Sequence, residues 1–142
     1  MTPTLVGRIQ TRIFLMATVG ALWTLIITPF LPGVTDRGLA YSITYLSLGI
    51  ITLIGIVWEF IYHGLQQFRW EKDWPTVLGL ITGIPEGIVA WLVLRQLVAP
   101  GLVTGTQFVI HFATTWFLVW LVANGPMRVL SLHWRFEGGR LV

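Results

Sequence analysis

Glu86 is the residue whose type and position most clearly suggest chemistry in this sequence. It lies in the run GLITGIPEG, residues 79–87, an apolar stretch in which a charged side chain is costly to place. Pro85 removes one backbone donor and should leave a carbonyl group without its helical hydrogen bond, which makes the surroundings locally polar. Glu86 is therefore a candidate proton or ion site. The alternative is a protonated, structural Glu86 that is hydrogen-bonded to a neighbouring helix or to another subunit.

His111 is the candidate second station of a proton path. If the third and fourth apolar segments are neighbouring helices, helical rise places His111 within about 6 Å of Glu86 in membrane depth, so the two side chains could touch. The alternative is a histidine whose ring is hydrogen-bonded to a backbone carbonyl or to Thr82, Thr114 or Thr115. Hydroxyl groups commonly make such bonds between membrane helices.

Glu59 and His63 are four residues apart, on one face of a helix near the end of the second apolar segment. Charge costs little at a membrane interface, so the spacing predicts an interfacial ion pair. Two such ligands are too few for a structural metal site, and we expect no metal. His63 and His111 lie toward opposite ends of their segments and cannot ligate one haem, so no cofactor is expected.

Signatures of enzymes are missing from the sequence. It contains no cysteine and no Gly-x-Ser-x-Gly, Walker or His-Glu-x-x-His motif. A lipid-modifying or redox enzyme would need polar groups gathered at one interface, and only Glu59, His63 and two aromatic-basic segments approach that description. The sequence thus gives no positive support for an enzyme.

The elements that must position these side chains are long apolar segments. Of the residues, 55% are hydrophobic and 11% are charged, which leaves too few polar side chains to coat a small soluble globule. Continuous apolar runs favour membrane helices over the alternating strands of a β-barrel, and each run is close to the roughly 20 residues that span a bilayer core. The predicted transmembrane helices are residues 13–31, 39–62, 77–94 and 107–123.

These segments predict one all-α integral membrane domain, residues 1–142, with four transmembrane helices in an antiparallel bundle joined by short connections. Seven of the nine basic residues flank one side of the spans, and Arg37 and Arg95 flank the other. This bias predicts that both termini are cytoplasmic, in a multi-pass protein of the plasma membrane. Basic residues that flank apolar runs do not indicate nucleic-acid binding.

Two of the expected cytoplasmic segments interleave aromatic and basic residues. One contains Arg69 and Trp70, and the other contains Trp134 and Arg135. Rings in this pattern prefer the headgroup layer, so we predict that both segments anchor the protein at the interface. Docking of a protein partner on this face is the alternative.

Gly79, Gly83 and Gly87 recur at a spacing of four and should line one helix face, where another helix can pack closely in the manner of a glycine zipper. Small size, this packing face and the lack of a catalytic set favour a structural or accessory subunit of a larger membrane complex. Its expected partners are lipid and other membrane subunits, or further copies of itself. The alternative is a small oligomeric ion- or proton-coupled transporter or channel that uses Glu86.

Overall fold

The computed structural model describes residues 3–69, 75–98 and 100–142, and every regular element within these ranges is a helix. The segments that are long and apolar enough to cross a membrane are Leu5–Phe30, Arg37–Gln67, Thr76–Leu97 and Gly105–Leu130. The chain is thus an all-helical protein of the multi-pass membrane type, as the hydropathy of the sequence predicts.

The first span begins earlier than hydropathy predicts. Its helical pieces are α1 (Leu5–Leu15), the π-helix η1 (Met16–Gly20), α2 (Ala21–Ile27) and the 3₁₀ turn η2 (Thr28–Phe30). The Thr4 hydroxyl accepts a hydrogen bond from the Gly7 amide and so caps the first turn. Arg8 and Arg12, which the sequence places before the span, therefore lie inside it.

The other three spans are one unbroken helix and two interrupted ones. The second is α3 (Arg37–Gln67), and the third is α4 (Thr76–Ile81), α5 (Gly83–Val93) and the π-helix η3 (Leu94–Val98). The fourth is α6 (Gly105–Asn124) with α7 (Pro126–Leu130), followed by the short α8 (Leu132–Phe136). The interruption at Thr82 lies three residues before Pro85, whose ring removes a helical donor.

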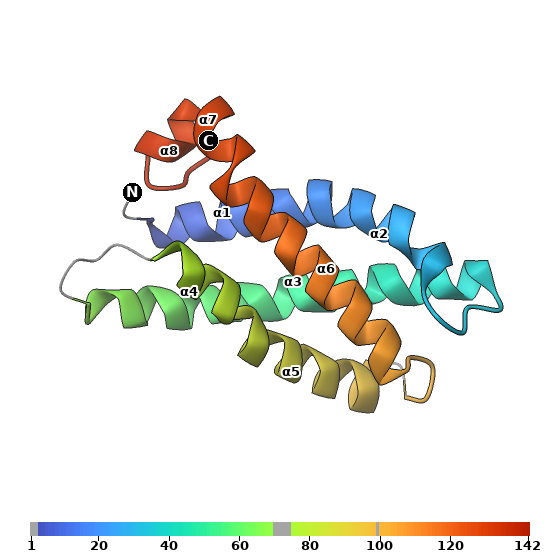
Figure 1. Ribbon diagram of the computed structural model, residues 1–142. Coiled ribbons are helices and arrows are strands. Elements are labelled where there is room, and N and C mark those ends of the chain that lie inside the picture. Colours follow the sequence, from blue (N-terminus) through green and yellow to red (C-terminus); the bar gives the residue numbers. More distant parts are fainter. Residues whose placement is uncertain (1–2, 70–74, 99) are drawn as a thin grey trace.

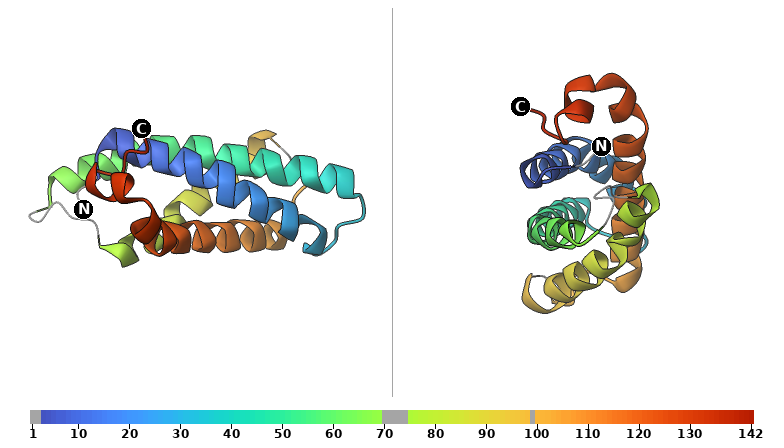
Figure 2. Two further views of the ribbon diagram at one scale, coloured as in Figure 1. Left: turned by 90° about the horizontal axis from the view of Figure 1, so that it is seen from above. Right: turned by 90° about the vertical axis from the view of Figure 1, so that its left-hand side faces the viewer.

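The helices form a layer with one helix laid across it (Figures 1 and 2). The end-on view in Figure 2 has α1, α3 and α5 side by side, with α3 in the middle and α6 crossing one face obliquely. Contacts agree with this view, because α3 packs against both α1 and α5, whereas α6 packs against η1, α2, α4 and α5. A side chain that joins α1 to α5 must therefore pass over α3.

The three glycines of the third span face aromatic rings of α6. At Gly83 and Gly87 the rings occupy the space in which a Cβ atom would lie, so a side chain there would displace them, whereas a Cβ at Gly79 would make only ordinary contact with its ring. The facing pairs are Gly79 with Trp120, Gly83 with Trp116, and Gly87 with Phe112. The glycine face thus receives aromatic side chains of the same chain.

The carboxyl-terminal segment folds back onto α1. The Trp134 indole donates to the Thr11 hydroxyl at 2.7 Å, and that hydroxyl donates in turn to the Gly139 carbonyl at 2.9 Å. Trp134 is only 4% exposed and packs with Leu15 and Met127, so its ring is buried within the chain and is not exposed on the surface. Burial of the ring here ties the two ends of the chain together.

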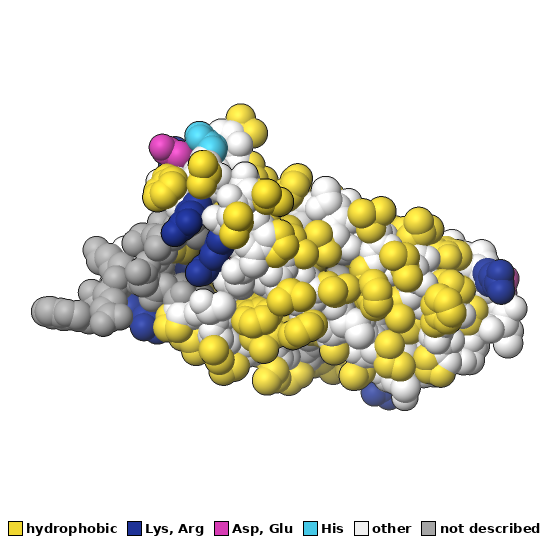
Figure 3. All heavy atoms as spheres, turned by 45° about the horizontal axis from the view of Figure 1, so that its top comes forward, with side chains coloured by type: hydrophobic (Ala, Val, Ile, Leu, Met, Phe, Trp, Pro, Cys, Tyr) yellow, Lys and Arg dark blue, Asp and Glu magenta, His cyan; other side chains and the backbone are white. Residues whose placement is uncertain are grey.

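The surface matches a membrane environment (Figure 3). Hydrophobic side chains cover the middle of the face shown, and charged side chains gather toward its two ends. Such an apolar belt flanked by charge is what a bilayer core between two polar interfaces requires.

Candidate functional site

A cluster of buried charged side chains joins α1, α3 and α5 within the membrane-spanning region. Arg12 of α1 donates through Nε to Glu59 Oε1 at 2.7 Å, and its Nη2 lies 2.6 Å from the same oxygen. Arg12 also donates to Glu86 through Nη1 at 2.8 Å and through Nη2 at 3.0 Å. Glu59 is 7% exposed and Glu86 is 1% exposed. One guanidinium is thus shared between two buried carboxylates from two different helices.

Gly55 leaves room for the Arg12 side chain, and Trp116 covers it. A Cβ atom at Gly55 would collide with the Arg12 guanidinium, so the absence of a side chain lets Arg12 cross α3 and reach Glu86. On the other side, the Trp116 ring covers the guanidinium, with Arg12 Cζ 5.3 Å from the ring centroid. The Arg12 guanidinium therefore lies between Gly55 of α3 and the Trp116 indole of α6.

Polar neighbours extend the cluster toward the end of the molecule where α1 begins. Arg8, one turn before Arg12, lies 3.5 Å from Glu59 Oε2 and donates to Gln66 Oε1 at 2.8 Å. Tyr62 lies beside Glu86 and donates to the Thr82 carbonyl at 3.0 Å, at the break between α4 and α5. This hydroxyl stabilises the interrupted helix next to the cluster.

The charges of the cluster balance. Arg8 and Arg12 contribute two positive charges, and Glu59 and Glu86 contribute two negative charges, so the sum is zero when all four are ionised. Removing such groups from water is expensive, and a well-packed apolar core would often hold helices together equally well. Ionisable groups inside a membrane span are therefore functional candidates by default.

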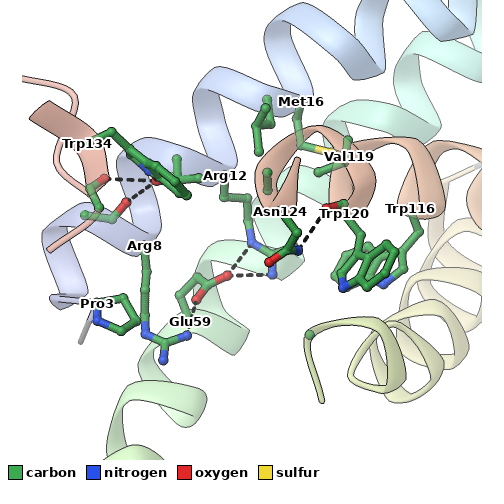
Figure 4. A pocket seen from close by; sticks show the side chains of 16 residues that line it. Pro3, Arg8, Arg12, Met16, Glu59, Trp116, Val119, Trp120, Asn124 and Trp134 are labelled. Carbon is green, nitrogen blue, oxygen red and sulfur yellow. Dashed lines mark hydrogen bonds and ion pairs between the residues drawn. The ribbon is translucent and has the colours of Figure 1, made fainter. Parts of the chain in front are cut away.

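A cavity of about 210 Å³ opens beside the cluster (Figure 4). Arg8, Arg12 and Glu59 lie on one side of it, with the Glu59 carboxylate between the two guanidinium groups. Trp116 and Trp120 lie across from them. Water or a small molecule in this cavity would thus contact Glu59 directly.

A second polar cluster occupies the opposite half of the molecule. His111 Nε2 lies 2.9 Å from the Thr24 hydroxyl, and Thr28 donates to the Thr24 carbonyl at 2.5 Å. The Thr28 hydroxyl also lies 2.9 Å from that of Thr44. A cavity of about 150 Å³ at this end is lined by His111, Thr44 and Ser47, so this cluster also has an opening.

Glu86 and His111 have separate partners, contrary to the contact considered from the sequence. Glu86 binds Arg12, whereas the His111 ring binds Thr24 rather than Thr82, Thr114 or Thr115. The sequence places both residues at similar depth. However, the first span supplies the partner in each case: α6 packs on α2, which brings Thr24 to His111, and Arg12 of α1 passes Gly55 of α3 to reach Glu86.

Glu59 does not form the predicted interfacial pair with His63. Its carboxylate binds Arg12 and Arg8 of α1, and it is buried because α1 packs along this face of α3. His63 is half-buried, with its Nε2 3.5 Å from the Gln67 amide and its Nδ1 without a hydrogen-bond partner. Glu59 and His63 are one helical turn apart on α3, but the Glu59 carboxylate pairs with the arginines of α1 instead of with His63.

The structure describes two of the remaining predicted interface residues, Arg69 and Arg135. Arg69 is half-buried and follows the end of α3, with its amide donating to the Gln66 carbonyl at 3.2 Å. Trp70 lies outside the described residues. Arg135 is exposed, with its guanidinium over the Phe136 ring.

Sequence reasoning missed Arg12 and Gly55. The signal for Arg12 lies in charge balance, because two acids inside apolar spans need cations at the same depth, and Arg8 and Arg12 are close to a span. Gly55 carries no such signal, since glycine is common in membrane helices. Within the described ranges, no group of three or more His, Asp and Glu side chains could hold a metal ion.

Comparison of the chain with protein-family models, with curated proteins and with solved structures finds no match to any of them. The function must therefore be inferred from the site itself.

Removing one member of the Arg12–Glu86 pair should destabilise the protein far more than removing both. Arg12→Met leaves Glu86 buried without a cation, a loss of about 3–5 kcal/mol in unfolding free energy. Arg12→Met/Glu86→Met should recover most of this loss, because Glu59 keeps Arg8. Thermal unfolding in detergent measures both variants, with Arg128→Met, an exposed arginine, as the control. A double variant as unstable as the single one would contradict the pairing.

Proposed function

We propose that this chain is a small proton-coupled transporter of the plasma membrane, in which Arg12 is shared between Glu59 and Glu86. The observation that carries the proposal is the position of one guanidinium between two carboxylates on different helices, beside a cavity. A proton on either carboxylate would leave Arg12 paired with the other one. Two protonation states would then favour two pairings, and hence two relative positions of α3 and α5.

The two cavities support transport from one end to the other. One cluster of buried apolar residues borders both cavities, because its members Met16 and Phe108 line the first and the second cavity, respectively. Leu48, Ile51 and Leu94 belong to the same buried cluster. An apolar layer between two cavities that each contain polar side chains fits a transporter that exposes its site to one side at a time better than an open channel.

Two of the spans are irregular at positions where the proposed change of helix positions would require them to bend. The π-helix η1, Met16–Gly20, separates the Arg12 level of the first span from the Thr24 level, and π-turns are frequent at functional sites. The break at Thr82 lies beside Glu86 in the third span. We assign both positions as hinges of the proposed change.

The charge bias of the sequence sets the proposed orientation. With the amino terminus, the carboxyl terminus and the loop between α3 and α4 in the cytoplasm, the four spans run antiparallel and the Arg12 cavity opens inward. His111 and its cavity then face the outside. Assembly into oligomers remains part of the proposal, since four helices alone enclose little volume.

An accessory subunit of a larger membrane complex is the second candidate. It is favoured by an apolar groove of about 540 Å³ along α5 and α6, where Ile84, Ile88 and Val109 are exposed. A helix of another subunit could pack there, close to the small residues Gly83 and Gly87. In this case the ion cluster would only fix the helices of the chain.

Transport should move protons when the right solute is present. We would reconstitute the protein in vesicles that hold a pH-sensitive dye and add solutes of four kinds: anionic, cationic, zwitterionic and uncharged. At least one kind should change the lumenal pH, and Glu86→Gln should reduce the initial rate at least tenfold because Arg12 loses one of its carboxylates. Glu137→Gln, an exposed acid, is the matched control.

Protein that moves no protons with any of the four kinds, or Glu86→Gln vesicles that equal the wild type, would rule out the proposed mechanism. Co-purification with a defined membrane complex would then favour the accessory subunit.

The proposed orientation can be read by labelling, because the chain has no native cysteine. A Thr35→Cys variant should react with a membrane-impermeant maleimide in intact cells, since it lies between the first two spans. Val142→Cys should react only after the membrane is permeabilised. The reverse pattern would invert the topology and place the Arg12 cavity on the outside.

A further inference from the structure

The cavity beside the ion cluster has an aromatic side and a charged side. Trp116 and Trp120 line one side together with aliphatic residues of α6, whereas Arg8, Arg12 and Glu59 supply the charged groups of the other side, where Trp134 also lies. Glu86 is not among the lining residues, and it reaches the cavity only through Arg12. The charges that a bound molecule would meet are thus two arginines and one carboxylate.

The indole groups of this cavity are already satisfied as hydrogen-bond donors. Each indole N–H donates to a group of the chain itself, which leaves ring surfaces to face the cavity. The bonds are Trp116 to the Leu80 carbonyl at 3.2 Å, Trp120 to the Thr76 carbonyl at 2.9 Å, and Trp134 to the Thr11 hydroxyl at 2.7 Å. An occupant would therefore place an apolar body against the Trp116 and Trp120 rings and a polar group toward α1.

The charge balance of the cluster indicates which charge the polar group of the bound molecule should carry. The cluster is neutral with both carboxylates ionised, so a proton on Glu59 would leave a net charge of +1 beside the cavity. Uncompensated charge in a membrane interior is unfavourable, and a bound anion would remove it. Arg8 stands nearest the end of the molecule, 3.5 Å from Glu59, and is placed to bind that anion.

We propose that the cavity binds a monovalent organic anion with an apolar body, and that the anion enters together with one proton on Glu59. The proposal rests on the transport function above and names its substrate class. Glu59 is the coupling acid because it lines the cavity, whereas Glu86 keeps Arg12 in place from the far side. The anion replaces the Glu59 carboxylate as the partner of Arg8.

The groups that surround Glu59 are compatible with this exchange. From α1 it meets Arg8 and Arg12, and from α5 it meets Glu86 through the shared Arg12. On α3 itself, Tyr62 and His63 are the neighbouring titratable side chains, one turn away. The described residues of α4, α6 and the carboxyl-terminal segment that line the cavity carry no titratable side chain.

Proton and anion binding should therefore be linked. If one proton accompanies each anion, the affinity for the anion rises about tenfold for each unit of pH lowered, as reciprocal linkage requires. Glu59→Gln has a permanently neutral side chain in place of the carboxylate. This variant should bind the anion at pH 8 at least as tightly as the wild type does at pH 6, with no pH dependence.

Three compounds that share a benzyl body and end in an anionic, a neutral or a cationic group test the proposal. Binding of phenylacetate, phenylacetamide and phenethylammonium to the full chain in lipid nanodiscs is measured by calorimetry between pH 6 and pH 8, where the carboxylate of phenylacetate stays ionised. Phenylacetate should bind at least tenfold more tightly than the other two at pH 6. Arg8→Gln should weaken it at least tenfold, whereas the exposed control Arg128→Gln should not.

The outcomes separate this inference from the transport function. Tighter binding of the amide or the ammonium, or an undiminished pH dependence in Glu59→Gln, would overturn the anion proposal. If either variant fails to fold, the wild-type comparison of the three compounds still decides the sign of the substrate. Proton movement in vesicles driven by a cationic, zwitterionic or uncharged solute, without phenylacetate binding, would leave the transport function standing and overturn the anion proposal alone.

Discussion

The ion pairing of Arg12 with Glu59 and Glu86 is the constraint on which the rest of the structure depends. A charge inside a membrane span must find a partner, and here a single guanidinium satisfies two carboxylates from two helices. Because α3 lies between α1 and α5, the reach of this side chain sets the spacing of all three helices. Gly55 is the position at which that reach becomes possible.

The fourth span completes the arrangement from one side. Trp116 covers the Arg12 guanidinium while filling the space over Gly83, so the glycine face of the third span and the ion cluster depend on the same ring. Trp134 closes the neighbouring end by binding α1. The cavity is what remains between these rings and the charged groups, and its position follows from the packing that protects the cluster.

Sequence patterns predicted the parts of this account that depend on a single segment. The four apolar spans, the buried Glu86 and the glycine spacing are each readable from local composition and helical period. The partners of Glu59 and His111 are not, because each comes from the first span and depends on how helices are arranged in space. Hydropathy also placed Arg12 outside the membrane, since it scores each residue without regard to acids on other helices.

The shared ion pair can be tested directly by measuring the proximity of the Arg12 guanidinium to the Glu86 carboxylate in a lipid bilayer. Solid-state NMR on protein with ¹⁵N-labelled arginine side chains and ¹³C-labelled glutamate carboxyl groups reports such contacts as dipolar dephasing. We expect strong dephasing of carboxyl signals, consistent with the Nη1–Oε2 distance of 2.8 Å, and its loss at Glu86 in Arg12→Met. A Glu86 signal that shows no dephasing in the wild-type protein would contradict the shared ion pair.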